Sequence, residues 1–376
     1  MPESLAMAQE ATRFERDGYM RRYADRIAAR YPTGKTSSDD PMDPTLRVDI
    51  LSMARTPAVY EHNAKVLKSY PGLATPSRSP NRIVASFLDN AVENILWLHD
   101  RFPVEMRERA SRWYDGANKL VHQWADEFGL PDRAIAGVIA SLSPQKDWFK
   151  NISLAERVLD IHHQAIDPVG ELYDFLPDAA MRETAQRIYA KDDFEVLRSE
   201  VISGTYRDMV DDTTRAMWLR AYDEAHSDRR YRQRTPEGDF VGEPAGVAAW
   251  GSLVEIAKAI SVIRDPSLEN ISRMMGVKHK VRSFYNNLLM PDAPFGDVTI
   301  DTHAVAAALL RPLSGQSAEL YNNFGSSAPR DKVPKGYKSI KSTNETGISG
   351  TYAFFADAYR LAADRRGTTP RKMQSI

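Results

Sequence analysis

Apolar residues recur along most of this chain at intervals of three and four positions, which is the spacing of one face of an α-helix. The clearest stripe runs from 81 to 98 and consists of the apolar pairs Ile83-Val84, Phe87-Leu88, Ala91-Val92 and Ile95-Leu96. This pattern predicts helices over 82–101 and 104–127. A third helix is expected over 131–142, which is almost wholly apolar and is followed by Pro144. Strand signals are sparse, so the sequence predicts an all-α protein.

Helical periodicity returns in the C-terminal part of the chain after a more polar stretch over 166–244, which we interpret as a long insertion. It predicts helices over 245–263, 267–275, 280–290, 301–311 and 349–364. A charged amphipathic segment over 5–30 and a helix over 46–69 are expected near the start. We therefore expect an N-terminal helical extension (1–80), a helical core carrying the insertion (81–325), and a basic loop with a C-terminal helix (326–376).

The composition excludes several kinds of site. The 376 residues are 42% hydrophobic and include no cysteine, which rules out disulfides, thiolate zinc sites and iron–sulfur clusters. No apolar run is long enough to span a membrane, and the first residues lack a signal-peptide layout, so we expect a cytosolic protein without membrane association. The net charge of −1 does not suit a general nucleic-acid coat. The segment 330–341 is nevertheless basic and could meet phosphates, or be a solvated surface loop.

The segment around Gly276 has the features of a phosphate-binding turn. One predicted helix ends there and another begins a few residues later, and a glycine can take the positive φ that such a turn requires. The next helix would aim free N–H groups at a phosphate, and cationic or ionisable side chains crowd its start: Lys278, His279, Lys280 and Arg282. The alternative is an ordinary helical hairpin with a solvated basic face.

Asp301 follows the β-prone run Val298-Thr299-Ile300 and precedes an apolar helical face, so we expect it to be a helix N-cap. Capping N–H groups and the helix dipole favour its ionised form. A carboxylate held in this way can serve as a counter-charge or proton acceptor. It can equally be a purely structural cap.

A third candidate segment, Ser143 to Asn151, follows the apolar helix. Gln145, Lys146 and Asn151 suit a surface that fills a vacated place in a base stack and hydrogen-bonds base edges. Within this turn, Trp148 is better explained as a core anchor. The adjacent His162 and His163 would face different sides of a helix, and we expect neither a metal site nor a cofactor.

Taken together, the three segments resemble those of the helix–hairpin–helix DNA glycosylase superfamily. That family has a Leu-Pro-Gly-Val-Gly-x-Lys hairpin, then Val-Asp-Thr-His with the essential aspartate, and a Ser-x-Gln turn upstream. Residues 274–280 (Met-Met-Gly-Val-Lys-His-Lys) match the hairpin, 300–303 (Ile-Asp-Thr-His) the aspartate segment and 143–145 (Ser-Pro-Gln) the turn. The proline and the second glycine of the hairpin are replaced here, and no cysteine cluster follows.

These departures, together with 143–151 and 280–287, look most like a phage branch of the superfamily, the amino acid:DNA transferases, also called α-glutamyl/putrescinyl-thymine pyrophosphorylases. The resemblance implies hypermodification of thymidine in double-stranded viral DNA, in the host cytoplasm, as protection from restriction. A free amino acid (glycine is our guess) or another amine would displace phosphate or pyrophosphate from phosphorylated 5-hydroxymethyluracil.

The resemblance implies that Asp301 and Lys280 are catalytic and that Gly276, Lys278, His279, Arg282, Gln145, Lys146 and Asn151 bind DNA. In a transferase, Asp301 would accept a proton from the incoming ammonium, and Lys280 would neutralise the leaving phosphate. In a glycosylase, Asp301 would stabilise positive charge on the sugar, and Lys280 would be a nucleophile or electrostatic helper. Both need the base turned out of the duplex. A non-catalytic DNA-binding protein is the third possibility.

Overall fold

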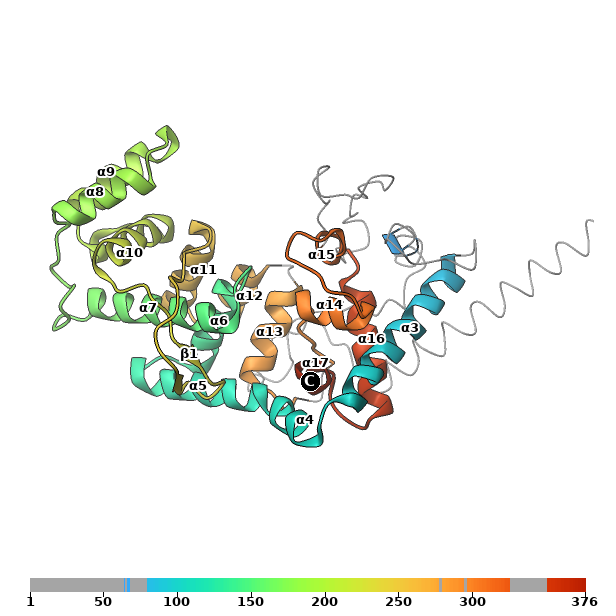
Figure 1. Ribbon diagram of the computed structural model, residues 1–376. Helices are drawn as coiled ribbons and strands as arrows, with labels where there is room; N and C mark the ends of the chain where they lie inside the picture. Colours follow the sequence, from blue (N-terminus) through green and yellow to red (C-terminus); the bar gives the residue numbers. More distant parts are fainter. Residues whose placement is uncertain (1–63, 65, 68–79, 277–278, 294–295, 325–349) are drawn as a thin grey trace, which may run out of the picture. The chain divides into compact units, whose positions relative to one another are not determined.

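The computed structural model of the protein describes residues 64, 66–67, 80–276, 279–293, 296–324 and 350–376 (Figure 1). Within these ranges almost all regular structure is helical. The exception is an antiparallel hairpin of β1 (Gln233–Arg234) and β2 (Phe240–Val241). The predicted all-α class is confirmed. The predictions for the amphipathic segment over 5–30 and the basic segment 330–341, and nearly all of the helix predicted over 46–69, lie outside the described residues.

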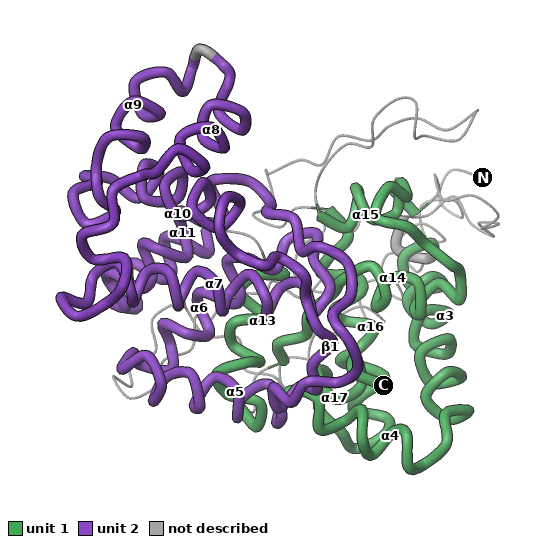
Figure 2. The backbone as a smooth tube through the Cα atoms, turned by 60° about the vertical axis from the view of Figure 1, so that its left-hand side comes forward, with its two compact units in different colours: residues 1–43, 47–114, 278–376 green, residues 44–46, 115–277 purple. Residues whose placement is uncertain are grey.

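The chain divides into two compact units (Figure 2). Unit 1 consists of 1–43, 47–114 and 278–376, and unit 2 of 44–46 and 115–277. The predicted core range, 81–325, contributes residues to both units, and the predicted insertion, 166–244, lies within unit 2.

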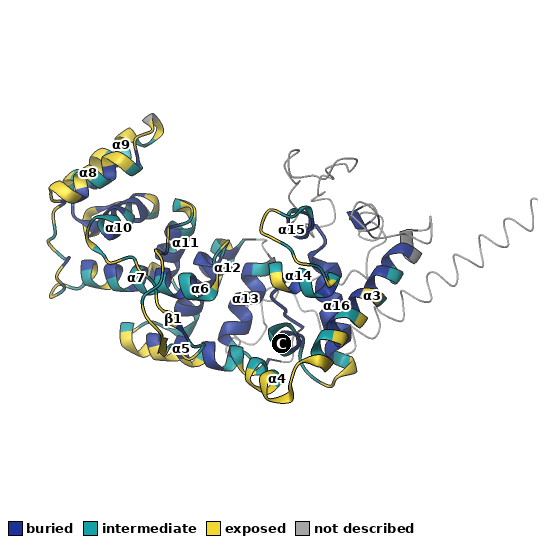
Figure 3. Ribbon diagram, viewed as in Figure 1, coloured by how far each residue is buried: buried dark blue, intermediate teal, exposed yellow. Residues whose placement is uncertain are grey.

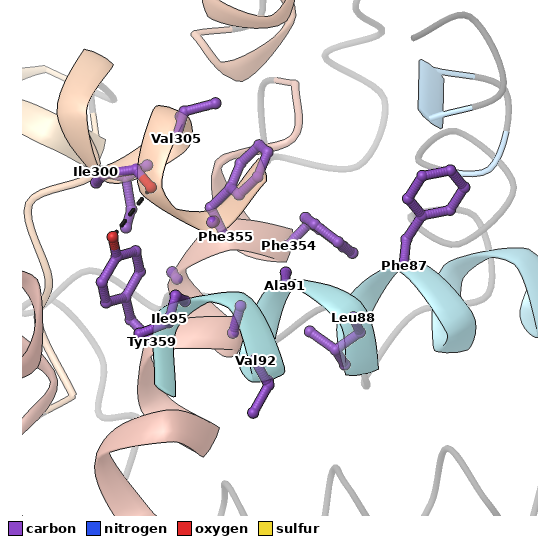
Figure 4. Close-up of a cluster of buried hydrophobic side chains, with 14 of the residues drawn as sticks. Phe87, Leu88, Ala91, Val92, Ile95, Ile300, Val305, Phe354, Phe355 and Tyr359 are labelled. Atoms are coloured by element: carbon purple, nitrogen blue, oxygen red, sulfur yellow. Dashed lines mark hydrogen bonds between the residues drawn. The ribbon is translucent and has the colours of Figure 1, made fainter. Parts of the chain in front are cut away.

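The described helices of unit 1 are α3 (Pro80–Arg101), α4 (Val104–Ser111), α13 (His279–Leu289), α14 (Thr302–Leu309), α15 (Ala318–Asn323), α16 (Tyr352–Arg365) and α17 (Pro370–Ser375). The apolar stripe of α3 packs against α14 and α16. Figure 4 shows Phe354 and Phe355 of α16 among the side chains of this core. Because α16 is buried along nearly its whole length (Figure 3), it can anchor neighbouring segments from inside the unit.

The described helices of unit 2 are α5 (Trp113–Phe128, of which the first two residues belong to unit 1), α6 (Asp132–Leu142), α7 (Trp148–Ile166), α8 (Ala179–Ile188), α9 (Glu195–Ser203), α10 (Asp212–His226), α11 (Leu253–Arg264) and α12 (Leu268–Met275), with short 3₁₀ turns η2 (Asp192–Phe194) and η3 (Tyr206–Asp208). As its apolar sequence predicts, α6 is central: it is buried from Ala134 to Leu142 and packs against α7, α11 and α12. The insertion is itself mostly helical, and α8 and α9 are its most exposed α-helices (Figure 3).

Two helix predictions need correction. The helix expected over 104–127 is interrupted at Arg112, which separates α4 from α5; α4 packs against α17 but buries none of its residues, so little apolar surface holds it in line with α5. The helix expected over 245–263 begins only at Leu253. Ser252 and Glu255 form a capping box that starts α11 there, and Gly246 and Gly251 precede it.

Candidate active site

A polar face of α13 lies beside the chain that leads to Asp301. The Asn286 Nδ2 group donates to the Asp297 carboxylate at 3.2 Å, and the Asn287 Nδ2 group donates to Thr299 Oγ1 at 3.3 Å. Lys280 lies on the same helical face as Asn287, seven residues earlier, and its charge interacts with that of Asp301. One face of α13 therefore contacts Thr299 through Asn287 and carries Lys280 within electrostatic reach of Asp301.

The segment 296–300 is buried and belongs to no helix or strand. Side chains of α16 bind its main chain instead. The Tyr352 hydroxyl donates to the Val298 carbonyl at 2.6 Å and accepts from the Ile300 N–H at 3.1 Å. The Arg360 Nε group donates to the Gly296 carbonyl at 2.9 Å. Side chains of α16 thus hydrogen-bond the main chain of this β-prone run, as a neighbouring strand would in a sheet.

Asp301 ends this segment and caps α14. Its Oδ1 atom accepts from the Ala304 N–H at 2.9 Å, so the predicted N-cap is confirmed. The side chain is partly exposed, in contrast to the five residues before it, which are buried. The carboxylate therefore lies where a buried, fixed chain meets an accessible surface, and one of its oxygens is used in capping.

Lys280 is affected by two opposing influences. Burial lowers the pKa of its ammonium group, and the negative charge of Asp301 acts in the opposite direction. The net direction is downward, which makes the neutral amine more accessible than in an ordinary lysine. A carboxylate and a partly desolvated lysine whose charges interact form a pair that can exchange protons with a reacting group.

Two buried tyrosines lie near the same carboxylate. Burial raises the pKa of Tyr114, the hydroxyl of which donates to Thr299 Oγ1 at 2.8 Å, and the Asp301 charge raises it further. Burial and Asp301 likewise raise the pKa of Tyr359. Its hydroxyl points toward α14 (Figure 4) and donates to the Ala304 carbonyl at 3.0 Å. Both phenols therefore remain protonated donors throughout the physiological pH range.

The candidate DNA-binding residues are divided between the units. Gly276 ends α12 in unit 2 with φ of 60°, so the expected positive φ is confirmed. Lys278 and the side chain of His279 lie outside the described residues. Arg282, in unit 1, is buried, and burial lowers the pKa of its guanidinium. An arginine in this position is not presented to solvent as a phosphate ligand would be.

The turn after α6 belongs to unit 2. Gln145 is exposed and has φ of 58°, which is unusual for a residue other than glycine. Lys146 is partly exposed, and Asn151 is buried in the first turn of α7. Asp147 caps that helix by accepting from the Lys150 N–H at 3.0 Å. Of the three proposed DNA contacts in this turn, Gln145 and Lys146 are accessible, whereas Asn151 is not.

Sequence reasoning did not identify Tyr114, Thr299, Asn287 and Tyr352 as parts of this site. For Asn287 a signal existed, since it lies seven positions after Lys280 and therefore on the same helical face. For Tyr114 and Tyr352 there was none. They come from positions 185 residues before Thr299 and 52 residues after Ile300, and only folding brings these pairs together.

Among the described residues, no three histidine, aspartate or glutamate side chains gather in a way that could hold a metal ion. His162 instead hydrogen-bonds the Tyr206 hydroxyl at 2.6 Å inside unit 2. No helix in the described ranges has the length and apolar character needed to cross a membrane.

Comparison with known proteins gives one similarity. Residues 79–227, less than half of the chain, match a family of unknown function, DUF7178. No curated protein and no solved structure matches the chain. The matched range covers α3 to α10 and includes Tyr114, but it ends before Lys280 and Asp301, so both catalytic candidates lie outside it.

Proposed function

We propose that this protein is a DNA-modifying transferase with a helix–hairpin–helix glycosylase-like fold, which attaches an amino acid to phosphorylated 5-hydroxymethyluracil in phage DNA. The observation that carries the proposal is the interaction between the charges of Lys280, on α13, and of Asp301, at the start of α14. The order of the hairpin, aspartate and Ser-Pro-Gln segments supplies the resemblance. The reaction would occur in the host cytoplasm and hypermodify thymidine against restriction.

The pair has the two charges that such a transfer requires. The ammonium of the incoming amino acid gives a proton to the Asp301 carboxylate, and the freed lone pair forms a C–N bond to the 5-methylene carbon. The C–O bond to phosphate breaks, and phosphate leaves with the bonding electrons toward the Lys280 ammonium. Partial burial strengthens both interactions, because charges act more strongly where water is excluded.

The accessible candidates in unit 2 support DNA binding. Gly276 gives the chain a turn that few other residues adopt, and Gln145 and Lys146 offer an amide and a cation at an exposed turn. Arg282 in unit 1 and Asn151 in unit 2 are buried, which favours a structural role for each within its own unit rather than direct contact with DNA.

The test is a reaction on duplex DNA carrying 5-phosphomethyluracil, with one amino acid at a time, followed by mass spectrometry of the nucleosides. We expect an amino-acid adduct with the wild-type protein and at least a hundredfold less with Asp301→Asn, because the amide cannot accept the proton. The matched control is Asp211→Asn, the same change at the N-cap of α10 in unit 2, which should retain the wild-type rate. Strong DNA binding without any product would contradict the proposal.

One observation favours a glycosylase as a second candidate. Burial lowers the pKa of Lys280, and a lysine with a lowered pKa is a better nucleophile for a Schiff base with a sugar. The same reactions distinguish the two functions. A glycosylase gives an abasic site instead of an adduct, and borohydride would link the DNA covalently to the wild-type protein but not to Lys280→Gln.

A further inference from the structure

We propose that the Tyr352 hydroxyl is the positioning group of this site: by binding the chain on either side of Thr299, it sets where the Asp301 carboxylate stands relative to Lys280. The inference rests on the proposed function for its catalytic consequence alone, since the positioning itself is a property of unit 1. Tyr352 makes no contact with the reacting atoms in this proposal and acts through Asp301.

The first argument is the geometry of the two hydrogen bonds. A phenol has one proton to donate and two lone pairs to accept, and Tyr352 uses its proton on the Val298 carbonyl and one lone pair on the Ile300 N–H. These atoms flank one residue, so the hydroxyl fixes that stretch of chain as a neighbouring strand would. Ile300 is directly followed by Asp301, which leaves little freedom between the fixed point and the carboxylate.

The second argument is that the same hydroxyl lies beside the helix that carries Lys280. The Ser283 side chain of α13 lies near enough to the Tyr352 hydroxyl to lower the pKa of the phenol, although no hydrogen bond joins the two, and it is three residues after Lys280 on the same face. The ring of Tyr352 is buried at the start of α16, which packs against α3 and α14. One rigid group therefore relates the chain before Asp301 to the helix of its partner.

The third argument is that no other anchor is equivalent. Arg360 binds the Gly296 carbonyl, several residues before Asp301, and Tyr359 binds the Ala304 carbonyl inside α14. Thr299 receives the hydroxyl proton of Tyr114 on its side chain, which leaves the main chain free to shift. Tyr352, by contrast, is hydrogen-bonded to the main chain on both sides of Thr299, as a donor to Val298 and as an acceptor from Ile300.

The test substitutes Tyr352→Phe, which keeps the ring and removes the oxygen. Its first readout is the pKa of the Lys280 amine, measured by NMR on protein with ¹³C-labelled lysine side chains and assigned with Lys280→Arg. Asp301→Asn should lower this pKa, because the carboxylate favours the ammonium. Tyr352→Phe should lower it in the same direction, since the carboxylate moves away.

The matched control is Tyr189→Phe. Tyr189 is equally buried, and its hydroxyl donates to the Met217 carbonyl at 3.1 Å in unit 2. It should cost stability in the same way while leaving the Lys280 pKa unchanged. An unchanged pKa in Tyr352→Phe, or an equal shift in Tyr189→Phe, would overturn the inference. Should Tyr352→Phe fail to fold, Ser283→Ala tests the inference in its place. It changes the surroundings of the Tyr352 hydroxyl on the α13 side and should lower the Lys280 pKa to a smaller extent.

The second readout is turnover on the phosphorylated DNA. Misplacement of a catalytic group by about 1 Å can cost on the order of a hundredfold in rate, so kcat of Tyr352→Phe should fall by roughly tenfold to a hundredfold with KM unchanged. A rise in KM with unchanged kcat would count against positioning. If the wild-type protein shows no turnover, the proposed function fails, while the Lys280 pKa still decides whether Tyr352 positions Asp301.

Discussion

At the scale of single residues, two positions have backbone conformations that restrict the side chain. Gly276 has positive φ, and a Cβ atom there would meet nothing within 4 Å, so its requirement for glycine is conformational rather than steric crowding by neighbours. Gln145 has positive φ without being glycine. Strained non-glycine residues persist where the surrounding structure holds them, and they concentrate at functional sites. The strain at Gln145 supports its place in the proposed DNA-binding turn.

The first prediction follows from that strain. Gln145→Gly should raise the free energy of unfolding by up to about 1 kcal/mol, because glycine removes the left-handed penalty although it adds chain entropy to the unfolded state. The same change should weaken DNA binding, since the amide is lost. Urea unfolding and DNA titration measure the two effects.

Gln145→Asn is the control, because asparagine tolerates this conformation and keeps a shorter amide. The asparagine variant should be about as stable as the glycine variant, but it should bind DNA more tightly than the glycine variant does. A glycine variant that is less stable than the wild type would show that the turn is not strained.

At the scale of elements, α14 shows how one residue can serve structure and chemistry together. Asp301 accepts the Ala304 N–H as the N-cap, and the same carboxylate is the proposed proton acceptor beside Lys280. The two roles depend on different properties of the side chain. Capping needs only an acceptor oxygen, which an amide also supplies, whereas proton transfer needs the charge of the carboxylate.

The second prediction separates these roles. Asp301→Asn should keep stability close to that of the wild type, whereas Asp301→Ala should lower it by about 1 kcal/mol through loss of the cap. Both variants should be inactive. Thermal unfolding and the nucleoside assay measure the two properties.

Ser252→Ala is the matched control, because it removes the capping box of α11 in unit 2 at a similar cost of about 1 kcal/mol. It should keep full activity, which would show that a lost cap does not abolish turnover by itself. Activity retained in Asp301→Asn would remove the aspartate from the mechanism.

At the scale of the whole molecule, the chain divides into two compact units. Unit 2 contains two buried ionisable residues that play no part in the proposed reaction. They are His162 and Tyr206, which are hydrogen-bonded to each other. Burial, with a contribution from the Arg215 charge, lowers the pKa of His162 to about 4. A histidine has an ordinary pKa of about 6.5 when the chain is unfolded.

The third prediction is the resulting pH dependence. Between about pH 6.5 and pH 4 the unfolded chain binds a proton at His162 that the folded chain does not, so the stability contributed by neutral His162 is lost as the pH falls through this window. His162→Gln should be less stable than the wild type near pH 7, and the difference should shrink toward pH 4.

The quantity to compare is the difference in unfolding free energy between the wild type and His162→Gln, because other groups titrate in both proteins. Asp160 is one of them, since burial, with a contribution from Glu156, raises its pKa to about 6. Denaturant unfolding at several pH values, followed by a signal from unit 2, measures the difference. A gap between the two proteins that stays constant over the window would contradict the lowered pKa.

The sequence alone determined the features that depend on neighbours a few residues apart. Apolar spacing of three and four gave α3, α6, α12, α13, α14 and α16, and local residue chemistry gave the positive φ of Gly276 and the N-cap at Asp301. These succeed because helical periodicity, capping and glycine freedom are short-range properties of the chain.

Tertiary structure decided what surrounds Asp301. Tyr114 reaches Thr299 across 185 positions, and Tyr352 reaches Val298 across 54, and no local pattern encodes either distance. Burial is similarly long-range, which is why Arg282 and Asn151 look like surface contacts in the sequence and are enclosed in the fold. The polar environment of a carboxylate depends on which distant side chains packing brings to it, and packing is a property of the folded chain alone.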